Sequence, residues 1–522
     1  MNLPRVTYSN TGEDFSGVHA HLDAIIPEVE ARLLGKIRPA LIGGRDRSEG
    51  QIVDARSPID RDLVLGEFPQ ADATLVNEAV EAARMAYPAW RDLGWPRRVT
   101  SLRAAADALE GRKWDVSVAC LIEVGKSRLE AVGEVEEAID LVRHYCDEME
   151  RTDGFREERP GSSSAEKCSV VLRPYGVFGV IAPFNFPVAL SIGMMSAALV
   201  AGNTIVFKPS DAAGLTGRMV AEILAEELPD GVVNLVHGGR ETGEALVRNP
   251  RVDGFAFTGS NAVGMTILRN AASSTAMRPV LAEMGGKNPA FVTASADLNV
   301  AASGVARSAF GLSGQKCSAA SKVYVASDVL DQFLEALLDA TGKLSVGDPR
   351  RQEIFMGPII NGKALDRFIN DSSEAASAGS IVAGGDRLRS GAFDRGRFVQ
   401  PTIVAGLPID HRINRDELFL PFISVLTFDD LDKAIADANQ SAFGLTAGVY
   451  TQDTEELDRF LNRIEAGVLY ANRASGATTG AWPGFQTFCG WKGSGTSGKG
   501  GLGSWYVPQF MREQSHTLYG AQ

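Results

Sequence analysis

From residue 204 onward, short β-rich runs alternate with helical patterns, and no other feature of the sequence restricts the possible folds as strongly. The runs cover residues 204–207, 232–236, 254–257 and 289–292. A helix between successive strands is the connection that parallel strands require, so the pattern predicts βαβ units and a parallel sheet. The alternation resumes with a run at 322–326, a helix at 330–344 and a run at 423–428. We therefore expect two α/β domains in tandem.

The first 150 residues predict mainly helices, at 18–35, 72–91, 97–109 and 116–149. In the last helix, four apolar residues at helical spacing form one stripe: Val132, Val135, Ile139 and Val142. Three charged residues are expected to face elsewhere: Glu134, Glu137 and Arg143. Glu123 and Lys126 flank Gly125 and predict a solvated charge pair near a helix joint rather than a ligand site. Residues 153–167 predict a turn between exposed strands.

The charge and cysteine content exclude several classes of protein. A net charge of −13 argues against broad binding to nucleic acid or an anionic membrane. The five cysteines are too few and scattered for a disulfide framework, and the six histidines predict no metal site. Residues 1–17 lack the apolar core of a signal peptide, and the apolar stretch at 188–200 is too short to span a bilayer. These features predict a reduced, cytoplasmic enzyme.

Cys317 lies among small residues and beside Lys316. Small neighbours let another molecule approach the sulfur, and nearby positive charge favours thiolate over thiol. An isolated cysteine is more often a buried structural residue, so both interpretations stand on this evidence alone. Glu283 and Asn185 lie upstream in distinctive stretches, Glu283-Met284-Gly285-Gly286-Lys287 and Phe184-Asn185-Phe186-Pro187. A nucleophile, a carboxylate base and an amide donor are the parts that covalent acyl chemistry requires.

Two of the expected strands end in segments typical of ligand sites in open α/β sheets. One runs into Lys208-Pro209-Ser210-Asp211, and the other runs into Thr258-Gly259-Ser260 before a helix. The helix N-terminus after Gly259 offers free amides to a phosphate. At these two strand ends, neither a Gly-x-Gly-x-x-Gly fingerprint nor a Gly-Lys-Ser/Thr phosphate loop is present. A dinucleotide site and an ordinary βα turn are both compatible with these residues.

The composition changes abruptly between residues 475 and 503, where 10 glycines occur. Four aromatic residues are interspersed: Trp482, Phe485, Phe488 and Trp491. Glycines permit backbone shapes that other residues cannot take, and aromatics give such a loop a hydrophobic footing. The stretch therefore predicts an ordered loop that lines a pocket, with a disordered linker as the alternative.

Six motifs occur in one order along the chain: Pro183-Phe184-Asn185-Phe186-Pro187, Gly202-Asn203-Thr204 before Lys208-Pro209, Phe257-Thr258-Gly259-Ser260, Glu283-Met284-Gly285-Gly286-Lys287, Gly314-Gln315-Lys316-Cys317 and Glu417-Leu418-Phe419. In the residues and order of these motifs, the chain resembles the aldehyde dehydrogenase superfamily over residues 35–515. Within it, the chain is most similar to the 1-pyrroline-5-carboxylate dehydrogenase (L-glutamate γ-semialdehyde dehydrogenase) family. That closer likeness rests on Gln315-Lys316-Cys317-Ser318-Ala319-Ala320-Ser321, Glu137-Ala138-Ile139-Asp140, and Thr479-Gly480-Ala481 before Gln486-Thr487-Phe488.

The resemblance implies an α/β fold with two Rossmann-like open-sheet domains and a small β oligomerisation flap. The implied parts are an NAD-binding domain (1–151 and 177–282), a catalytic domain (283–500) with a substrate loop (475–503), and oligomerisation strands (152–176 and 501–522). A homodimer or larger homo-oligomer is accordingly expected.

The implied reaction is NAD-dependent oxidation of an aldehyde to a carboxylic acid. The Cys317 thiolate would attack the aldehyde to form a thiohemiacetal, with the oxyanion held by the Asn185 amide and the Cys317 N–H. After hydride transfer, Glu283 would activate the water that hydrolyses the thioester. The implied substrate is L-glutamate γ-semialdehyde, formed from 1-pyrroline-5-carboxylate in proline catabolism. The alternatives are a sibling enzyme acting on another carboxylated or aromatic aldehyde, and a catalytically silent structural homologue.

The resemblance also implies the residues that bind the cofactor and the substrate. The cofactor set is Ile181, Pro183, Phe184, Lys208, Ser210, Asp211, Gly259, Ser260, Val263, Gly285, Glu417 and Phe419. A carboxylate at Asp211 would repel a 2′-phosphate and so favours NAD over NADP, and Leu420 replaces the glycine that usually follows the phenylalanine. The substrate set is Phe186, Ser318, Gly480, Ala481, Phe488 and Glu137. The segment between Arg473 and Thr479 is about three residues longer than usual, and Thr487 and Cys489 replace an expected proline and glycine.

Overall fold

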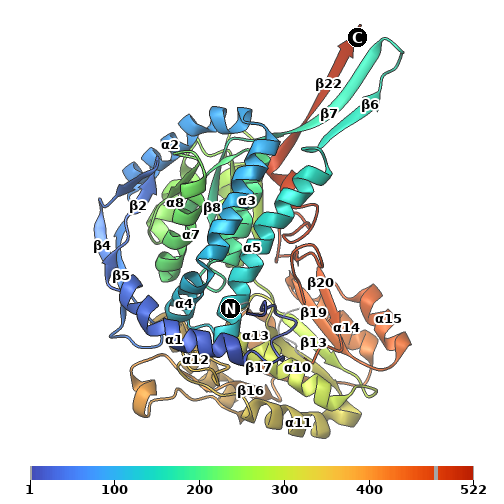
Figure 1. The fold of residues 1–522 in the computed structure, drawn as a ribbon. Coiled ribbons are helices and arrows are strands. Elements are labelled where there is room, and N and C mark those ends of the chain that lie inside the picture. The colour runs from blue at the N-terminus through green and yellow to red at the C-terminus, as the bar shows by residue number, and fades with distance from the viewer. Residues whose placement is uncertain (1–2, 475–479, 521–522) are drawn as a thin grey trace.

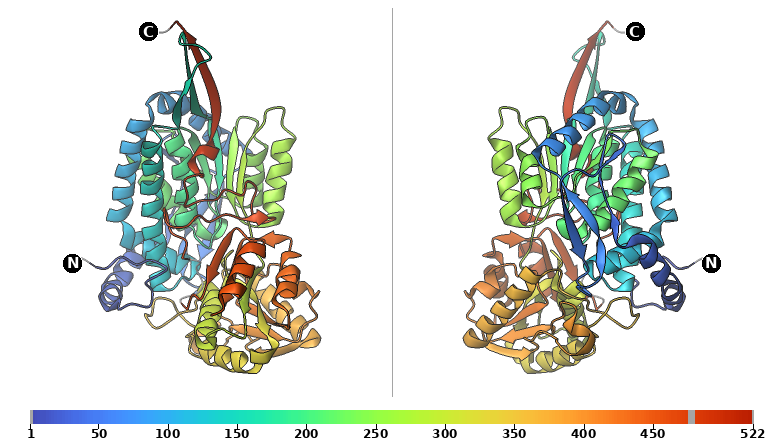
Figure 2. Two further views of the ribbon diagram at one scale, coloured as in Figure 1. Left: turned by 90° about the vertical axis from the view of Figure 1, so that its right-hand side faces the viewer. Right: turned by 90° about the vertical axis from the view of Figure 1, so that its left-hand side faces the viewer.

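A computed structural model describes residues 3–474 and 480–520 and contains two open, mainly parallel sheets, as the sequence predicts. Each sheet forms the centre of its own α/β unit. Figure 1 shows one unit above the other, with a narrow β flap that projects from the upper unit. Figure 2 shows that the segment after residue 480 passes along the junction between the units and continues up to the flap.

Within the described residues, the first sheet has seven strands in the order β12 (Val280–Glu283), β11 (Gly254–Thr258), β8 (Val177–Ile181), β9 (Thr204–Lys208), β10 (Val233–Leu235), β2 (Ala40–Ile42) and β3 (Arg45–Arg47). The first five strands are parallel to their neighbours, and β2 and β3 add an antiparallel edge. Every residue of β8 and β9 is buried, which is the pattern of strands covered on both faces by helices. The surrounding helices are α2 (Ala73–Asp92), α3 (Trp95–Gly111), α4 (Lys113–Val124), α5 (Arg128–Arg151), α6 (Ala189–Ala201), α7 (Gly214–Glu227), α8 (Arg240–Arg248) and α9 (Asn261–Ala272).

The second sheet also has seven strands in the described part of the chain, in the order β15 (Ser380–Ala383), β16 (Thr402–Ala405), β17 (Phe422–Phe428), β14 (Ala320–Ala326), β13 (Asn288–Val292), β19 (Thr446–Tyr450) and β20 (Val468–Ala471). All are parallel to their neighbours except β15. Its helices are α10 (Leu298–Phe310), α11 (Leu330–Gly342), α12 (Gly362–Ala378), α13 (Arg412–Arg415), α14 (Leu431–Asn439) and α15 (Thr454–Arg463). The predicted tandem arrangement of two α/β units is therefore confirmed.

Three small sheets complete the fold. The flap consists of β6 (Arg156–Pro160), β7 (Glu166–Pro174) and β22 (Met511–Tyr519), with β7 in the middle. The turn predicted between exposed strands at 153–167 corresponds to the β6–β7 hairpin, in which every β6 residue is exposed. The other two sheets are β1 (Lys36–Ile37), β5 (Val64–Gln70) and β4 (Gln51–Arg56), and the pair β18 (Phe443–Gly444) and β21 (Trp491–Lys492).

The helical pattern at 116–149 is interrupted at Gly125, which ends α4 in the left-handed region with φ of 77°. A side chain there would be strained, and its Cβ would also lie 2.7 Å from Pro358 Cδ. The solvated charge pair predicted beside this joint is wrong. Glu123 and Lys126 are only 1% and 0% exposed.

Both buried side chains have polar partners, and those of Glu123 are distant in the sequence. Glu123 accepts hydrogen bonds from the backbone N–H groups of Leu215 (2.7 Å) and Thr216 (2.8 Å), at the N-terminus of α7. Lys126 Nζ lies 2.5 Å from Glu134 Oε2, a second buried carboxylate. Glu134 and Glu137 lie off the apolar stripe of α5, as predicted, but face the protein interior instead of solvent. The Glu123 carboxylate compensates the free amides and the positive dipole at the N-terminus of α7.

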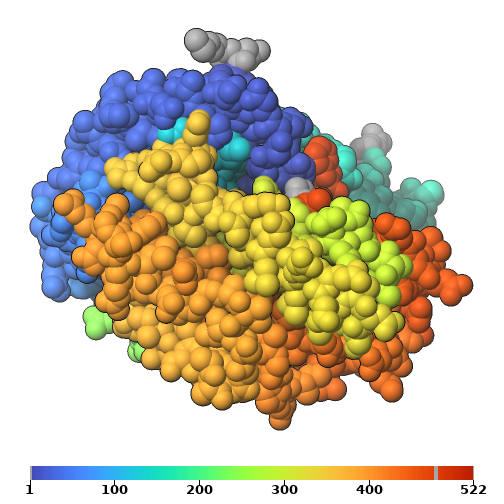
Figure 3. Space-filling model, turned by 90° about the horizontal axis from the view of Figure 1, so that it is seen from below, coloured from blue at the N-terminus to red at the C-terminus, as the bar shows by residue number. Residues whose placement is uncertain are grey.

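The two units share a hydrophobic cluster that contains Ile122 of α4, Phe368 of α12 and Phe422 of β17. The N-terminal helix α1 (Ser16–Leu33) joins the same cluster through residues such as Leu22. Seen from below, the N-terminal residues and the gold residues that follow α11 lie side by side (Figure 3). The junction between the units is thus a packed core, not a hinge spanned by linkers.

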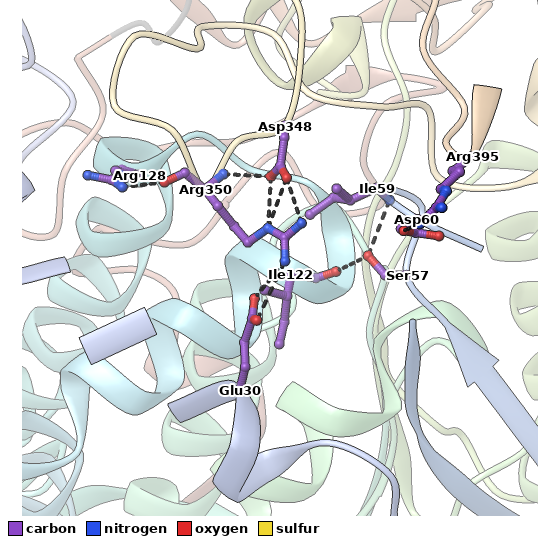
Figure 4. A network of polar contacts seen from close by, with 9 residues as sticks. All are labelled: Glu30, Ser57, Ile59, Asp60, Ile122, Arg128, Asp348, Arg350 and Arg395. Carbon is purple, nitrogen blue, oxygen red and sulfur yellow. Dashed lines mark hydrogen bonds and ion pairs between the residues drawn. The ribbon is translucent and has the colours of Figure 1, made fainter. Parts of the chain in front are cut away.

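Polar contacts reinforce this junction (Figure 4). Arg350, in the segment after α11, forms an ion pair with Asp348 at 2.6 Å and another with Glu30 of α1 at 3.2 Å. Arg128 of α5 donates its Nε to the Arg350 carbonyl at 2.7 Å. Nearby, Ser57 Oγ donates to the Ile122 carbonyl at 2.6 Å. The contacts of Arg350 with Glu30 and Arg128 fix the segment after α11 against α1 and α5 of the other unit.

Candidate active site

The segment before Cys317 has an unusual backbone. Leu312 and Ser313 have φ angles of 48° and 55°, and Gly314 follows with 66°. A Cβ on Gly314 would lie 2.1 Å from the Leu420 carbonyl oxygen, so only glycine fits this close approach. Gln315 holds the turn, because its amide donates to the carbonyls of Leu312 (3.1 Å) and Pro358 (3.3 Å) and accepts from Ile360 N–H (2.9 Å). The turn is therefore locked before the cysteine.

The backbone of Cys317 itself is fixed by Asn288, the first residue of β13. Asn288 Nδ2 donates to the carbonyls of Cys317 (2.6 Å) and Ala319 (2.9 Å), and Oδ1 accepts from Thr446 N–H (3.0 Å). On the other side, a Cβ on Gly286 would lie 2.8 Å from the Cys317 carbonyl oxygen. The cysteine thus has a defined position between two strands of the second sheet and the end of the first.

A cavity of about 110 Å³ brings together residues from widely separated parts of the chain. Seven of the predicted site residues line it: Cys317, Glu283, Ser318, Phe186, Ala481, Phe488 and Glu137. Asn185 is 3% exposed and precedes the lining residue Phe186, but neither Asn185 nor Gly480 is itself among the lining residues in the described part of the chain. The remaining walls are mostly apolar, with Leu141, Tyr145, Met194, Leu502 and Tyr506.

In the part of the glycine- and aromatic-rich stretch that the structure describes, residues 480–503, several residues line the cavity, as the first of its two interpretations predicts. Ala481, Phe488, Gly501 and Leu502 all line the cavity. Thr479 lies outside the described residues. Phe485, by contrast, is 86% exposed and does not contribute to the lining.

Glu283 is the last residue of β12, and its carboxylate accepts a hydrogen bond from Gly490 N–H at 2.9 Å. Burial raises its pKa to about 8, and the Gly490 hydrogen bond offsets this in part. Desolvation disfavours the charged form of a carboxyl group. At neutral pH the site therefore holds a carboxyl group poised between its acid and base forms, as acid–base catalysis requires.

The environment of Cys317 differs from the prediction. Burial raises the pKa of its thiol to about 12, and the carboxylates of Glu417 and Glu283 act in the same direction, partly offset by nearby backbone N–H groups. The expectation that Lys316 favours the thiolate is wrong, because its Nζ forms an ion pair with Glu130 at 2.5 Å. Successive residues point in different directions, so the ammonium group next in sequence serves another site. The free protein holds a neutral thiol.

The predicted cofactor residues follow adjacent strands of the first sheet. Ile181 ends β8 and leads to Pro183 and Phe184, Lys208 ends β9 and leads to Ser210 and Asp211, and Gly259 and Ser260 follow β11 and lead to Val263 in α9. Since β8 lies between β9 and β11, these segments meet at one edge of the sheet. The N-terminal amides of α9 have no partner within the helix, and Ser260 is exposed beside them. The residues present therefore fit a dinucleotide whose pyrophosphate lies at α9.

Lys208 is buried, and its ammonium group donates to the carbonyls of Pro209 (2.9 Å) and Gly238 (2.7 Å). Burial lowers its pKa to about 8. Asp211 is exposed at the start of a short 3₁₀ turn and raises the Lys208 pKa slightly by its charge. Ser210 Oγ accepts from Ala212 N–H at 3.2 Å and so closes this turn.

A second group of predicted cofactor residues lies between the two units. Glu417 Oε1 accepts from Gly286 N–H at 3.0 Å, and a Cβ on Gly285 would collide with its carboxylate at 2.0 Å. Burial raises the pKa of Glu417 to about 6. Phe419 has a φ of 57°, and its ring meets that of Phe184 edge-on with centroids 5.9 Å apart. Leu420 is 3% exposed and packs in the hydrophobic cluster shared by the two units. Its side chain therefore points away from Glu417 and Phe419.

Sequence reasoning missed two residues of the site: Asn288, which fixes the Cys317 backbone, and Tyr8, which lines the cavity. Asn288 directly follows the Glu283–Lys287 stretch. A side-chain amide at the start of a strand, next to that motif, could have indicated a residue of the site. Nothing in the local sequence around Tyr8 indicates that its side chain lines the cavity. Tyr8 comes from an irregular N-terminal segment that approaches α5 only in the folded chain.

Comparison with known proteins identifies the family. The aldehyde dehydrogenase family model matches residues 45–515. The chain belongs to the aldehyde dehydrogenase family. As a member, it is an oxidoreductase that acts on aldehydes. The fold and the order of motifs described above are those of this family.

Related aldehyde dehydrogenases agree along nearly their whole length. The 1-pyrroline-5-carboxylate dehydrogenase of Geobacillus thermodenitrificans is 36% identical over 92% of both chains, and that of Bacillus subtilis is 35% identical over 90% of both. The crystal structure of 1-pyrroline-5-carboxylate dehydrogenase from Thermus with bound NAD has a TM-score of 0.92 and 32% identity. It covers 99% of this chain and 100% of that one.

The described part of this aldehyde dehydrogenase contains neither a candidate metal site nor a candidate membrane-spanning helix. In residues 3–474 and 480–520, no group of three or more histidine, cysteine, aspartate or glutamate side chains is placed to hold a metal ion. None of the helices in that part of the chain is long and apolar enough to cross a membrane.

Proposed function

We propose that this aldehyde dehydrogenase oxidises L-glutamate γ-semialdehyde, the open form of 1-pyrroline-5-carboxylate, to L-glutamate with NAD as the oxidant. The observation that carries the proposal is the single cavity lined by Cys317, Glu283 and Ser318. The names of the relatives at 35–36% identity support the choice of substrate.

The first step is attack of the Cys317 sulfur on the aldehyde carbon. Forming the C–S bond requires loss of the thiol proton, and the Glu283 carboxylate in the same cavity is a base available to accept it. The developing oxyanion is held by the Asn185 side-chain amide and the Cys317 N–H. Asn288 serves this step indirectly, because its two hydrogen bonds keep the Cys317 backbone in register.

A nicotinamide cofactor supplies the acceptor for the hydride that leaves the former aldehyde carbon. Glu283 first releases the thiol proton to solvent, and the remaining thioester is then hydrolysed by a water molecule from which the Glu283 carboxylate removes a proton. Glu283 has to be ionised for this role, and its pKa of about 8 keeps both forms accessible near neutrality. Cys317 then regains its proton as the carboxylic acid departs.

The cofactor would lie along the edge where β8, β9 and β11 end. Lys208 and Asp211 are assigned to the adenine ribose, Ser260 to the pyrophosphate, and Glu417 with Phe419 to the nicotinamide ribose. An exposed carboxylate at Asp211 repels the 2′-phosphate of NADP, which favours NAD. The Thermus relative with bound NAD supports NAD as the cofactor.

For the substrate, Ser318 Oγ and the amides of Gly480 and Ala481 would hold the α-carboxylate, and Phe186 and Phe488 would flank the carbon chain. Gly480 has a φ of 79°, and a Cβ there would collide with the Arg473 guanidinium at 2.1 Å. The loop therefore needs glycine at this position on steric grounds as well. Glu137 is a weaker candidate, whose charge would suit a substrate ammonium group.

The domain roles form part of the same proposal. Residues 1–151 and 177–282 would bind NAD, and residues 283–500 would provide the nucleophile and the substrate loop. The strands within 152–176 and 501–522 would mediate oligomerisation.

An aromatic or aliphatic aldehyde is the second candidate substrate. The side chains of Leu141, Tyr145, Met194 and Tyr506 give the cavity apolar walls. Such walls stabilise a hydrophobic ligand more than a charged amino acid.

Steady-state kinetics with glutamate γ-semialdehyde, hexanal and benzaldehyde, each with NAD and with NADP, test the proposal. We expect the highest kcat/KM for glutamate γ-semialdehyde with NAD, and loss of activity in Cys317→Ser. A preference for benzaldehyde or hexanal would support the second candidate. Absence of NADH and NADPH formation with every aldehyde would mean a catalytically silent homologue.

A further inference from the structure

A second cavity, of about 230 Å³, lies beside the one that contains Cys317. Among the described residues, Tyr8 is the one side chain that lines both cavities. We call the cavity with Cys317 the inner chamber and the larger one the outer chamber. Tyr8 is only 9% exposed, so its ring is enclosed by protein on most sides.

Tyr8 has a fixed position. Its hydroxyl donates to Glu137 Oε2 at 2.7 Å. Its ring meets Phe186 edge-on at a centroid distance of 6.2 Å and Trp482 at 5.6 Å. Phe186 and Glu137 line the inner chamber themselves, so the tyrosine completes one of its walls.

The segment that carries Tyr8 is held at two further points, although it contains no helix or strand. Arg5 forms ion pairs with Asp140 at 2.9 Å and with Glu136 at 3.0 Å, both on α5. Trp482 Nε1 donates to the same Asp140 at 2.8 Å. The N-terminal segment and the loop after residue 480 therefore share one anchor on α5.

The outer chamber differs from the inner one in chemistry. Arg128 and Arg307 contribute to its walls together with the Lys316–Glu130 ion pair, and residues 352–355 close another side. That last segment is fixed by the ion pairs of Arg350 shown in Figure 4. The outer chamber is the larger and the more polar of the two, whereas the inner chamber is smaller and mostly apolar.

We propose that Tyr8 is a specificity-determining residue, a partition that limits the length of the aldehyde accepted at Cys317 by closing the inner chamber toward the outer one. The proposal rests on the proposed oxidation of aldehydes at Cys317. Its ring acts as the barrier, and its hydroxyl positions Glu137. Removing the ring joins the two chambers, and the tail of a longer ω-carboxy aldehyde then extends past residue 8 toward Arg307 and Lys316.

Three substitutions separate the two roles of the side chain. Tyr8→Phe keeps the ring and removes the hydrogen bond to Glu137, Tyr8→Leu shortens the barrier but stays apolar, and Tyr8→Ala removes it. Ser9→Ala is the matched control, since Ser9 is the exposed neighbour and lines neither chamber. The Leu variant keeps the test decisive if the Ala variant does not fold.

The first measurement is kcat/KM for unbranched ω-carboxy aldehydes of four, five, seven and nine carbons. In the unsubstituted protein, Tyr8→Phe and Ser9→Ala, we expect activity to fall sharply beyond five carbons. In Tyr8→Ala or Tyr8→Leu, the ratio of activity on seven carbons to that on five rises by about tenfold or more. An unchanged ratio in both variants would overturn the proposal, and so would a shift of the same size in Tyr8→Phe.

The second measurement does not depend on catalysis. Alkylation of Cys317 is followed by peptide mass spectrometry with iodoacetamide and with a maleimide that carries a long polar tail. We expect Tyr8→Ala and Tyr8→Leu to increase the maleimide rate relative to the iodoacetamide rate by about tenfold, with no change in Ser9→Ala. If this shift occurs but no aldehyde is oxidised, the proposed function fails and the partition stands. If neither ratio changes, the partition is refuted.

Discussion

At the level of single residues, burial determines the chemistry of the cavity. It raises the pKa of the Cys317 thiol to about 12 and that of the Glu283 carboxyl group to about 8. Each group is therefore neutral over most of the physiological pH range, and the two gain charge in the order Glu283 first, Cys317 second. A base that ionises before the nucleophile can accept the proton of the nucleophile when substrate arrives.

The role of Glu283 gives a pH-dependent prediction. The hydrolysis step needs the carboxylate form, so kcat of the unsubstituted protein is expected to rise as pH increases through about 8 and to level off above it. In Glu283→Gln this rise disappears, and turnover falls by roughly 10²- to 10⁴-fold. Because Glu283 is also the proposed acceptor of the Cys317 thiol proton, rapid-mixing measurements should show slow NADH formation without a burst in this variant. A variant that turns over at the unsubstituted rate would exclude Glu283 as the base.

Asn185 offers a separate test of oxyanion stabilisation. Asn185→Ala is expected to lower kcat by on the order of 10²-fold, with a smaller effect on KM, because the amide acts on charge that develops in the transition state. Asn462→Ala is the control, since Asn462 is an exposed amide on α15. Equal kcat values for the two variants would remove Asn185 from the mechanism.

At the level of helices and strands, most elements could be predicted from the sequence, because each depends on local periodicity and on the residues at its ends. The strand at 254–257 and the helix N-terminus after Gly259 appear as β11 and α9 for this reason. The environment of Glu123 and Lys126 could not be predicted in this way. Their partners, Leu215 and Glu134, lie on other helices. From the sequence alone, a charged residue without a known partner is predicted to be exposed to solvent.

The cap that Glu123 provides to α7 gives a stability prediction. Glu123→Ala leaves two buried backbone N–H groups without an acceptor and is expected to lower the free energy of unfolding by about 1–3 kcal/mol. Glu123→Gln should cost less, since its side-chain oxygen still accepts one of these bonds. Urea denaturation at fixed pH measures both, and a loss no larger in Ala than in Gln would contradict the capping role.

The same residue makes stability depend on pH. Burial raises the pKa of Glu123 to about 7 in the folded protein, above the ordinary value of 4.5 for a glutamate side chain. The folded state therefore binds more protons than the unfolded state between these values, and the contribution of Glu123 to stability is lost as pH rises through about 7. Since glutamine does not titrate, the difference between Glu123→Gln and the unsubstituted protein should be smaller at pH 8 than at pH 5.5.

At the level of the whole molecule, the cavity is assembled from parts that the sequence keeps far apart. The motifs around Asn185, Glu283 and Cys317 predict a shared site only because their order resembles that of a known family. The N-terminal segment with Tyr8 belongs to no such motif, and its contact with Glu137 depends on how α5 packs between the two units. A pattern-based prediction finds elements that carry their own periodicity and misses segments held only by long-range side-chain contacts.

The flap is built mainly from exposed residues. All of β6 is exposed, and Leu518 and Tyr519 of β22 are 56% and 79% exposed. Figure 1 shows the flap standing clear of both α/β units. Long exposed edge strands associate with other chains unless they are covered. A second copy of the chain would cover both the edges and the apolar side chains.

We therefore expect a homodimer or larger assembly that depends on β22. Light scattering after gel filtration should give at least twice the single-chain mass of 55.6 kDa for the unsubstituted protein. Leu518→Asp places a charge on a side chain that is exposed in the single chain, so folding is retained while association is weakened toward 55.6 kDa. Met85→Asp, at an exposed position of α2, is the control and should leave the mass unchanged. A single-chain mass for the unsubstituted protein would refute the role of the flap, and an unchanged assembly in Leu518→Asp would place the interface elsewhere.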